Sequence, residues 1–176
     1  MSAPQRILIT GFMAAGKTTV GAALAHILDC RMLDLDEYIS GREGRSIQAI
    51  IDEEGEPQFR LIEKRALREA LEDDTARVIT LGGGTWMSDD NRALIAEHYG
   101  FTIWLDTPFE LCWKRTMSAG DTRPLARDRE QALRLYKARR STYELASLRV
   151  SLNEADDAGM IAAKILSALR TAQYEG

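Results

Sequence analysis

The stretch RILITGFMAAGKTTVGAALAHI, residues 6–27, combines an apolar run, a glycine-bearing turn and an amphipathic segment. The apolar run covers residues 7–10 and predicts a short buried strand. Residues 11–18 fit G-x-x-x-x-G-K-[ST], the pattern of a phosphate-binding loop, or P-loop. Between residues 20 and 28, apolar side chains recur at the spacing of one helix face. We therefore expect a strand, a P-loop and a helix in this order.

Each part of this loop has a physical role in holding a phosphate. Gly11 and Gly16 allow the backbone to wrap closely, so that successive N–H groups point at phosphate oxygens. The helix that begins there adds the positive end of its dipole. Lys17 supplies a charge to the β- and γ-phosphates, and the Thr18 hydroxyl is a ligand for Mg²⁺. A chance glycine turn is the alternative, but the position of the pattern between a strand and a helix favours a phosphate site.

The rest of the chain repeats the order of strand and helix. Further strands are expected at residues 31–35, 78–81, 101–105 and 148–152. Helices are expected at residues 46–51, 57–71, 89–98, 108–116, 129–146 and 157–172, with a loop at 119–128. Strands that alternate with helices form parallel sheets covered on both faces. The sequence therefore predicts an α/β fold, a three-layer sandwich with a central five-stranded parallel sheet. Ligands of such sheets bind beyond the carboxyl ends of the strands.

Two carboxylates, Asp34 and Asp36, stand at the end of the second expected strand. Since side chains alternate along a strand, we expect both carboxylates on the same side of it. One of them could hold the water shell of a metal while the other faces an acceptor hydroxyl group. The alternative is a polar strand end without chemistry, which the nearby P-loop disfavours.

A glycine triplet, Gly82-Gly83-Gly84, follows the third expected strand directly. Three consecutive glycines cost conformational entropy wherever they occur, so they need a reason. Close approach of the backbone to a ligand is one reason, and a flexible turn is another. The triplet alone does not distinguish the two.

Basic residues gather in the second half of the chain. Residues 114–140 contain nine Lys or Arg against three Asp or Glu, in a protein of net charge −4. Arg123 falls in the expected loop and Arg139 on the helix after it, while Arg60 lies on an earlier helix. Guanidinium groups bind carboxylates and phosphates through paired hydrogen bonds, so these arginines are candidates to hold anions. For three other residues we prefer a solvated helix face: Arg129, Arg134 and Lys137.

Length and composition exclude several classes of protein. A chain of 176 residues with 45% hydrophobic and 28% charged residues is typical of one globular domain. No apolar run approaches the roughly 20 residues of a membrane-spanning helix. The net charge of −4 makes binding to nucleic acid or to anionic lipid unexpected. Cys30 and Cys112 match no metal-site spacing, and we expect a reducing, cytoplasmic location.

Together these residues resemble the shikimate kinase family, in the nucleoside-monophosphate-kinase-like branch of P-loop proteins. The matching segments are GFMAAGKTTVG, LDLDEYI, GRSIQAIIDEEGEPQFRLIE, LGGG, TRPLA and RRSTYELA. They occur in the order of the family and cover roughly residues 6–155. The GRSI…GE…FR..IE block is more specific than the P-loop, because unrelated activities share P-loops.

The resemblance implies a P-loop NTPase-type fold and ATP-dependent phosphorylation of the shikimate 3-hydroxyl with Mg²⁺. It implies a single kinase domain over residues 1–176, with a substrate-binding segment at about 36–64 and a lid at about 117–128. The implied nucleotide-binding residues are Gly11, Ala14, Ala15, Gly16, Lys17, Thr18, Thr19, Arg115 and Arg123. The implied substrate-binding residues are Asp36, Arg60, Gly82, Gly83, Gly84 and Arg139.

The resemblance also assigns roles within these sets. Lys17, Asp36 and Arg123 are the implied catalytic residues, and Thr18 and Asp34 the implied metal residues, Asp34 through water. Asp36 would grip the acceptor hydroxyl and act as the base. In the other implied roles, Arg60 and Arg139 clasp the substrate carboxylate, Arg115 stacks on adenine, and Arg123 reaches the phosphates from the lid. Arg139 is assigned rather than Arg140 because the family places an arginine four residues before a tyrosine, here Tyr143.

Two other classes of function are also considered. One is a P-loop kinase of another small acid or polyol, such as gluconate, or of a nucleoside monophosphate. The other is a non-catalytic ATP-binding regulator, against which the complete set of site residues argues. A monomer is expected, and the sequence assigns no role to Ile51 or Trp86.

Overall fold

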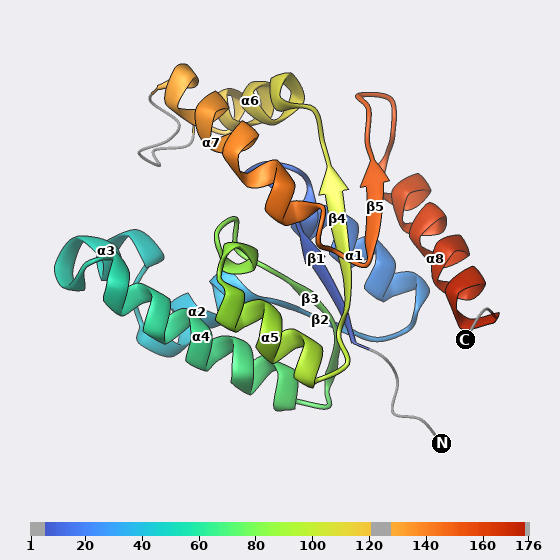
Figure 1. Ribbon diagram of the computed structural model, residues 1–176, viewed down its shortest axis with the longest axis horizontal. Coiled ribbons are helices and arrows are strands. Elements are labelled where there is room, and N and C mark those ends of the chain that lie inside the picture. Colours follow the sequence, from blue (N-terminus) through green and yellow to red (C-terminus); the bar gives the residue numbers. More distant parts are fainter. Residues whose placement is uncertain (1–5, 121–127, 175–176) are drawn as a thin grey trace.

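Among the described residues, 6–120 and 128–174, five parallel strands form a sheet in the order β2-β3-β1-β4-β5. The strands are β1 Ile7–Thr10, β2 Arg31–Asp34, β3 Ala76–Thr80, β4 Phe101–Asp106 and β5 Leu148–Ser151. In this computed structural model helices lie on both sides of the sheet (Figure 1), and all four residues of the central strand β1 are buried. The expected α/β fold with a five-stranded parallel sheet is confirmed.

The helices form two groups around the sheet. They are α1 Lys17–Ile27, α2 Leu35–Glu43, α3 Ile47–Glu54, α4 Glu56–Glu72, the 3₁₀ turn η1 Thr85–Met87, α5 Asp89–Glu97, α6 Phe109–Ser118, α7 Arg129–Tyr143 and α8 Ala158–Tyr174. Helices α1 and α8 pack against each other, and α4 packs against α2, α3 and α5 (Figure 1). None of the helices in the described ranges is both long and apolar enough to cross a membrane.

One expectation about local structure is wrong. Asp36 does not continue the second strand, which ends at Asp34. The Asp34 carboxylate accepts hydrogen bonds from the backbone N–H groups of Asp36 and Glu37, at 3.1 and 3.2 Å, and so caps helix α2. Asp36 therefore lies in the first turn of a helix, and strand alternation does not place the two carboxylates. Helix α2 was missed because it buries only Leu35 and Ile39, too few residues to mark an apolar face.

The remaining differences concern where elements begin and end. Strand β3 begins at Ala76 rather than at residue 78, and helix α7 ends at Tyr143 rather than at residue 146. The 3₁₀ turn η1, which follows the glycine triplet, was not expected. Three residues are too few to show a helical period in a sequence.

Helix α1 lies close against strand β3 because Gly21 has no side chain. A Cβ at Gly21 would lie 2.6 Å from Thr80 Cγ2 and 2.9 Å from Met32 Sδ. Both distances are well below the separation of atoms in a packed interior. Helix α1 therefore packs closer to the sheet than a side chain at position 21 would allow.

A buried carboxylate at the end of β4 holds helix α7 to the sheet and also pairs with an arginine of the neighbouring strand β5. Asp106 is 8% exposed and accepts hydrogen bonds from Arg140 Nη1 at 2.7 Å and Arg149 Nη2 at 2.6 Å. Both guanidinium groups also lie over the Trp104 ring, at 5.0 and 4.9 Å from its centre. Burial alone would raise the pKa of Asp106, but the hydrogen bonds from the two arginines outweigh it and lower that pKa. The Arg140 guanidinium therefore stabilises the fold through its ion pair with Asp106.

We expect Gly21→Ala to destabilise the protein and Gly41→Ala not to do so. Gly41 lies on α2, and no atom lies within 4 Å of the Cβ that it would gain. Both changes bring a similar gain in helix propensity, about 1 kcal/mol at most. Their difference therefore isolates the steric conflict at Gly21, which should cost about 1–3 kcal/mol. Urea unfolding measures both variants, and equal stabilities would contradict the close packing of α1 on β3.

We expect Asp106→Asn to lower the free energy of unfolding at neutral pH by about 1–3 kcal/mol, because two guanidinium groups lose their shared carboxylate. The pKa of Asp106 is lower in the folded than in the unfolded state. Its contribution is thus present above the unfolded-state pKa and is lost as the pH falls through the folded-state pKa. The difference from the wild type should therefore shrink below about pH 4.

Urea unfolding at several pH values tests this dependence on Asp106. The control is Asp74→Asn, since the exposed Asp74 carboxylate pairs with Arg6 at 2.9 Å and should matter little. A stability difference that stays constant down to the lowest pH would show that the charge of Asp106 is not what holds α7.

Candidate active site

The P-loop connects the end of β1 to the start of α1. Gly16, the N-cap of α1, has a φ of +99°, a conformation that favours glycine. Ala14 also adopts a left-handed backbone, with a φ of +55°. Lys17 Nζ donates to the carbonyl oxygens of Gly11 and Phe12 at 2.9 Å each, so its ammonium group lies over the loop. A helix that begins at such a loop favours a bound anion.

A pocket of about 590 Å³ runs along the P-loop, a size suited to a small-molecule ligand. Ten of the site residues expected from the sequence line it: Ala14, Ala15, Gly16, Lys17, Thr18, Thr19, Asp34, Asp36, Gly83 and Arg115. The sequence did not point to the nine other lining residues, of which four lie together near the end of the chain: Leu152, Asp156, Ala158 and Ile161. They follow the carboxyl end of β5, and the rule that ligands bind at strand ends was the available signal for them.

Oxygen atoms gather beside the start of α1. Thr18 Oγ1 donates to Asp34 Oδ2 at 2.7 Å, and Thr80 Oγ1 donates to the same oxygen at 2.8 Å. Mg²⁺ prefers oxygen ligands and usually keeps several of its waters. Across residues 6–120 and 128–174, no group of three His, Cys, Asp or Glu side chains forms a ready metal cage. The residues present fit an ion held by Thr18, by Asp34 through water, and by phosphate oxygens.

The glycine triplet lies against two of the charged residues expected at the substrate. A Cβ at Gly82 would lie 2.6 Å from Asp36 Oδ1. A Cβ at Gly84 would lie 2.8 Å from Arg60 Nη2. Real side chains do not approach so closely, so any residue other than glycine would displace these functional groups. Close approach of the backbone is therefore a physical reason for the triplet.

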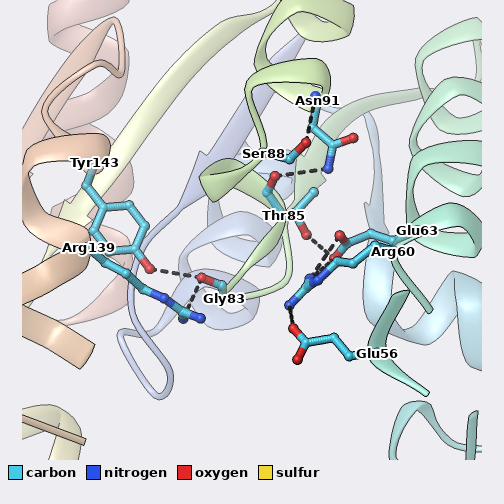
Figure 2. A network of polar contacts seen from close by, with 9 residues as sticks. All are labelled: Glu56, Arg60, Glu63, Gly83, Thr85, Ser88, Asn91, Arg139 and Tyr143. Carbon is cyan, nitrogen blue, oxygen red and sulfur yellow. Dashed lines mark hydrogen bonds and ion pairs between the residues drawn. The ribbon is translucent and has the colours of Figure 1, made fainter. Parts of the chain in front are cut away.

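Helix α7 holds the Gly83 carbonyl. This oxygen accepts hydrogen bonds from Arg139 Nη1 at 2.9 Å and from the Tyr143 hydroxyl at 3.0 Å (Figure 2). The two donors are four residues apart and so share one face of the helix. Burial raises the pKa of Tyr143 to about 12, so its phenol remains a donor at neutral pH. One end of the Arg139 guanidinium is thus fixed on the triplet, beside the residues that line the pocket.

The other two carbonyls of the triplet are also engaged. Gly82 O accepts from the backbone N–H of Thr85 at 3.2 Å, and Gly84 O accepts from that of Met87 at 3.1 Å. These bonds form the turn η1. Because all three carbonyl oxygens accept hydrogen bonds within the protein, the triplet is a fixed segment rather than a flexible turn.

Two carboxylates of its own helix orient Arg60. Its Nη1 lies 3.0 Å from Glu63 Oε2 and its Nη2 2.9 Å from Glu56 Oε1 (Figure 2). Glu63 is 1% exposed and also accepts a hydrogen bond from Thr85 Oγ1 at 2.8 Å. Burial by itself lowers the pKa of Arg60, but the two glutamates outweigh it and raise that pKa. Since Thr85 follows the triplet, this network fixes Arg60 next to Gly84.

Arg115 lies at the P-loop end of the pocket. Its Nη1 donates to the carbonyl oxygens of Ala14 and Ala15 at 3.3 and 3.4 Å. The guanidinium therefore contacts the loop itself, and its stacking on adenine stays a prediction. Arg123 and residues 121–127 of the expected lid lie outside the described residues.

The two ends of the pocket differ in chemistry. At one end the P-loop, the start of α1 and Lys17 favour phosphate groups. At the other end Asp36 and Gly83 line the pocket, and the guanidinium groups of Arg60 and Arg139 lie at the triplet beside it, outside the lining residues. A small acid could bind the arginines through its carboxylate and turn a hydroxyl group towards Asp36. The arrangement suits transfer of a phosphoryl group from one end to the other.

The sequence of this chain is similar to those of known kinases. The family model for shikimate kinase matches residues 13–170. The shikimate kinase of Persephonella marina is 37% identical over 148 residues, which are 84% of this chain and 88% of that protein. The shikimate kinase of Salinibacter ruber is 42% identical over 125 residues, which are 71% of this chain and 60% of that protein.

A solved structure extends the match to three dimensions. The shikimate kinase from Acinetobacter baumannii in complex with shikimate has a TM-score of 0.87 and 33% sequence identity to this chain. The superposition covers 96% of this chain and 94% of that one. The resemblance seen in the motifs is therefore confirmed, and the chain belongs to the shikimate kinase family.

Proposed function

We propose that this chain transfers the terminal phosphoryl group of ATP to the 3-hydroxyl group of shikimate, in the biosynthesis of aromatic amino acids. The observation that carries the proposal is the meeting of Asp36, Arg60 and Arg139 at the glycine triplet, beside a P-loop pocket. Family membership and the solved relative that holds shikimate support the same substrate.

The arginines are suited to the carboxylate of the substrate. Guanidinium groups bind carboxylates bidentately, and both Arg60 and Arg139 are held in place by contacts with the protein. The triplet beside them carries no side chains, so the ring of a small cyclic acid can lie against the backbone. Kinases of gluconate or of a nucleoside monophosphate also need cations for an anion, and the family assignment favours shikimate over both. The P-loop lysine and Asp36 argue against a non-catalytic regulator.

Asp36 is suited to the acceptor hydroxyl group. With the carboxylate held at the arginines, the 3-hydroxyl would donate a hydrogen bond to Asp36, which directs the oxygen towards the terminal phosphorus of ATP. Asp36 takes the proton as the new P–O bond forms and the bond to ADP breaks. Phosphoryl transfer depends mainly on the positions of the reacting groups and on neutralisation of the phosphate charge. The Asp36 carboxylate positions the acceptor oxygen.

The negative charge of the ATP phosphates would be neutralised at the P-loop end of the pocket. Backbone N–H groups of the loop and Lys17 would hold the phosphates, with Arg115 next to them. Mg²⁺, when bound, would offset the negative charge of the phosphates. Thr18 and Asp34 would hold this ion, Asp34 through water. Arg123 is proposed to reach the phosphates from the lid.

The proposal includes the organisation of the protein. Residues 1–176 would form one domain, with a substrate-binding segment at about 36–64 and a lid at about 117–128. A cytoplasmic monomer is proposed, with shikimate and ATP as its partners and neither nucleic acid nor a membrane among them. The net charge of −4 supports the absence of nucleic acid.

The proposed function predicts that shikimate stimulates the release of ADP from MgATP. A coupled assay would compare shikimate with gluconate, quinate and AMP as acceptors, and phosphorus NMR would identify the hydroxyl that is modified. Shikimate alone should raise the rate, with the phosphate on its 3-oxygen. Tight binding of ATP without stimulation by any of the acids would contradict the proposal.

The proposed role of Asp36 predicts that Asp36→Asn lowers kcat by about 100-fold or more, because the amide cannot take the proton. The KM for ATP should change little, since Asp36 lies at the triplet end of the pocket. Steady-state kinetics with both substrates measures these constants. Asp90→Asn is the control, because the exposed Asp90 pairs with Lys64 at 2.7 Å and should leave kcat unchanged. A kcat for Asp36→Asn within a few-fold of the wild type would rule out this role.

A further inference from the structure

Trp86 has no part in the proposed chemistry, yet it is buried between the glycine triplet and helix α7. It belongs to η1 and is 4% exposed. Its indole Nε1 donates a hydrogen bond to the carbonyl oxygen of Thr142 at 2.9 Å. That carbonyl lies in the last turn of α7, where backbone oxygens carry the negative end of the helix dipole. The indole therefore connects the segment after the triplet to the end of α7.

Hydrogen bonds cross this contact in both directions. From α7, Arg139 and Tyr143 donate to the Gly83 carbonyl, as Figure 2 shows. From η1, Trp86 donates to the Thr142 carbonyl. These residues form what we call the α7 clasp: Gly83, Trp86, Arg139, Thr142 and Tyr143. Since both acceptors are backbone atoms, the clasp fixes the two main chains relative to each other.

Neighbouring side chains hold the two aromatic rings of the clasp. Arg92 Nη1 donates to the backbone oxygen of Trp86 at 2.6 Å, and its guanidinium carbon lies 5.9 Å from the centre of the indole ring. The Tyr143 ring stacks on Trp104, with 5.8 Å between ring centres. The indole N–H and the phenol O–H are thus aimed at their acceptors by contacts within the protein.

We propose that Trp86 is a positioning residue for substrate binding, which acts by holding the Arg139 guanidinium at the glycine triplet. The inference rests on the proposed function and deepens it, because it names what sets the place of one carboxylate-binding arginine. Neither Trp86 nor Arg139 is among the residues that line the pocket; the indole contacts α7, which carries Arg139, so its effect is transmitted through that helix. A guanidinium held in place before binding loses less conformational entropy when the carboxylate arrives.

Trp86→Phe tests this role, because it keeps an aromatic ring and removes the N–H donor. The KM for shikimate should rise about threefold to tenfold, the loss expected for one neutral hydrogen bond. The kcat and the KM for ATP should stay within about twofold of the wild type. Trp113→Phe is the matched control: its half-buried ring lies on α6, stacked on Phe109 with 6.2 Å between centres, and should leave the KM for shikimate unchanged.

A double-mutant cycle with Arg139→Lys separates positioning from general stability. If the indole acts through Arg139, then Trp86→Phe should raise the KM for shikimate little further once Arg139 is replaced. Effects that simply multiply would overturn the inference. A lower melting temperature for Trp86→Phe with an unchanged KM for shikimate would also overturn it, since it would show a structural role alone.

A measurement without substrate keeps this test independent of the proposed function. The side-chain Nε–H resonance of Arg139, assigned by its loss in Arg139→Lys, should shift or broaden in Trp86→Phe and not in Trp113→Phe. If the wild type fails to phosphorylate shikimate, the proposed function fails while this resonance still reports on the clasp. A resonance that is the same in Trp86→Phe and in the wild type would refute the positioning of Arg139 by Trp86.

Discussion

Gly82 and Gly84 carry no Cβ, and the charged groups of Asp36 and Arg60 occupy the space that a Cβ would need. Asp36 approaches one of these glycines from α2, and Arg60 approaches the other from α4. Arg139 reaches the glycine between them from α7. Helices α2 and α4 and the distant helix α7 thus direct their functional groups at one short piece of backbone, which its own hydrogen bonds hold rigid.

Adjacent arginines on α7 serve different purposes because the helix separates them by about 100°. Arg140 turns to the sheet, where its guanidinium and that of Arg149 donate hydrogen bonds to Asp106. Arg139 turns to the triplet, where it meets a carbonyl, a neutral acceptor that leaves the positive charge unpaired by that contact. The division of partners therefore assigns Arg140 to the fold, whereas Arg139 is the arginine proposed to bind the substrate.

The sequence predicts the architecture well, because strands and helices leave local periodic patterns and the P-loop has a fixed spacing. The place of Asp36 was beyond such reasoning, since α2 begins at a side-chain cap and buries only two residues. The role of Trp86 could not be predicted from local sequence patterns either. Its hydrogen bond joins residues 56 positions apart, and no local pattern encodes which backbone oxygen an indole will meet. The functional groups could be named from motifs, whereas the contacts that orient them follow from tertiary packing.

The engaged carbonyls of the triplet have a consequence for molecular recognition. An amide offers a ligand either an acceptor, its oxygen, or a donor, its N–H. Here each of the three oxygens already accepts from the protein, and that of Gly83 has both lone pairs in use. The Gly83 peptide oxygen therefore has no acceptor capacity left for a ligand, so a polar contact with this oxygen is closed to a ligand donor. At this one position the backbone disfavours a ligand group that presents a hydrogen, independently of the charge on the arginines.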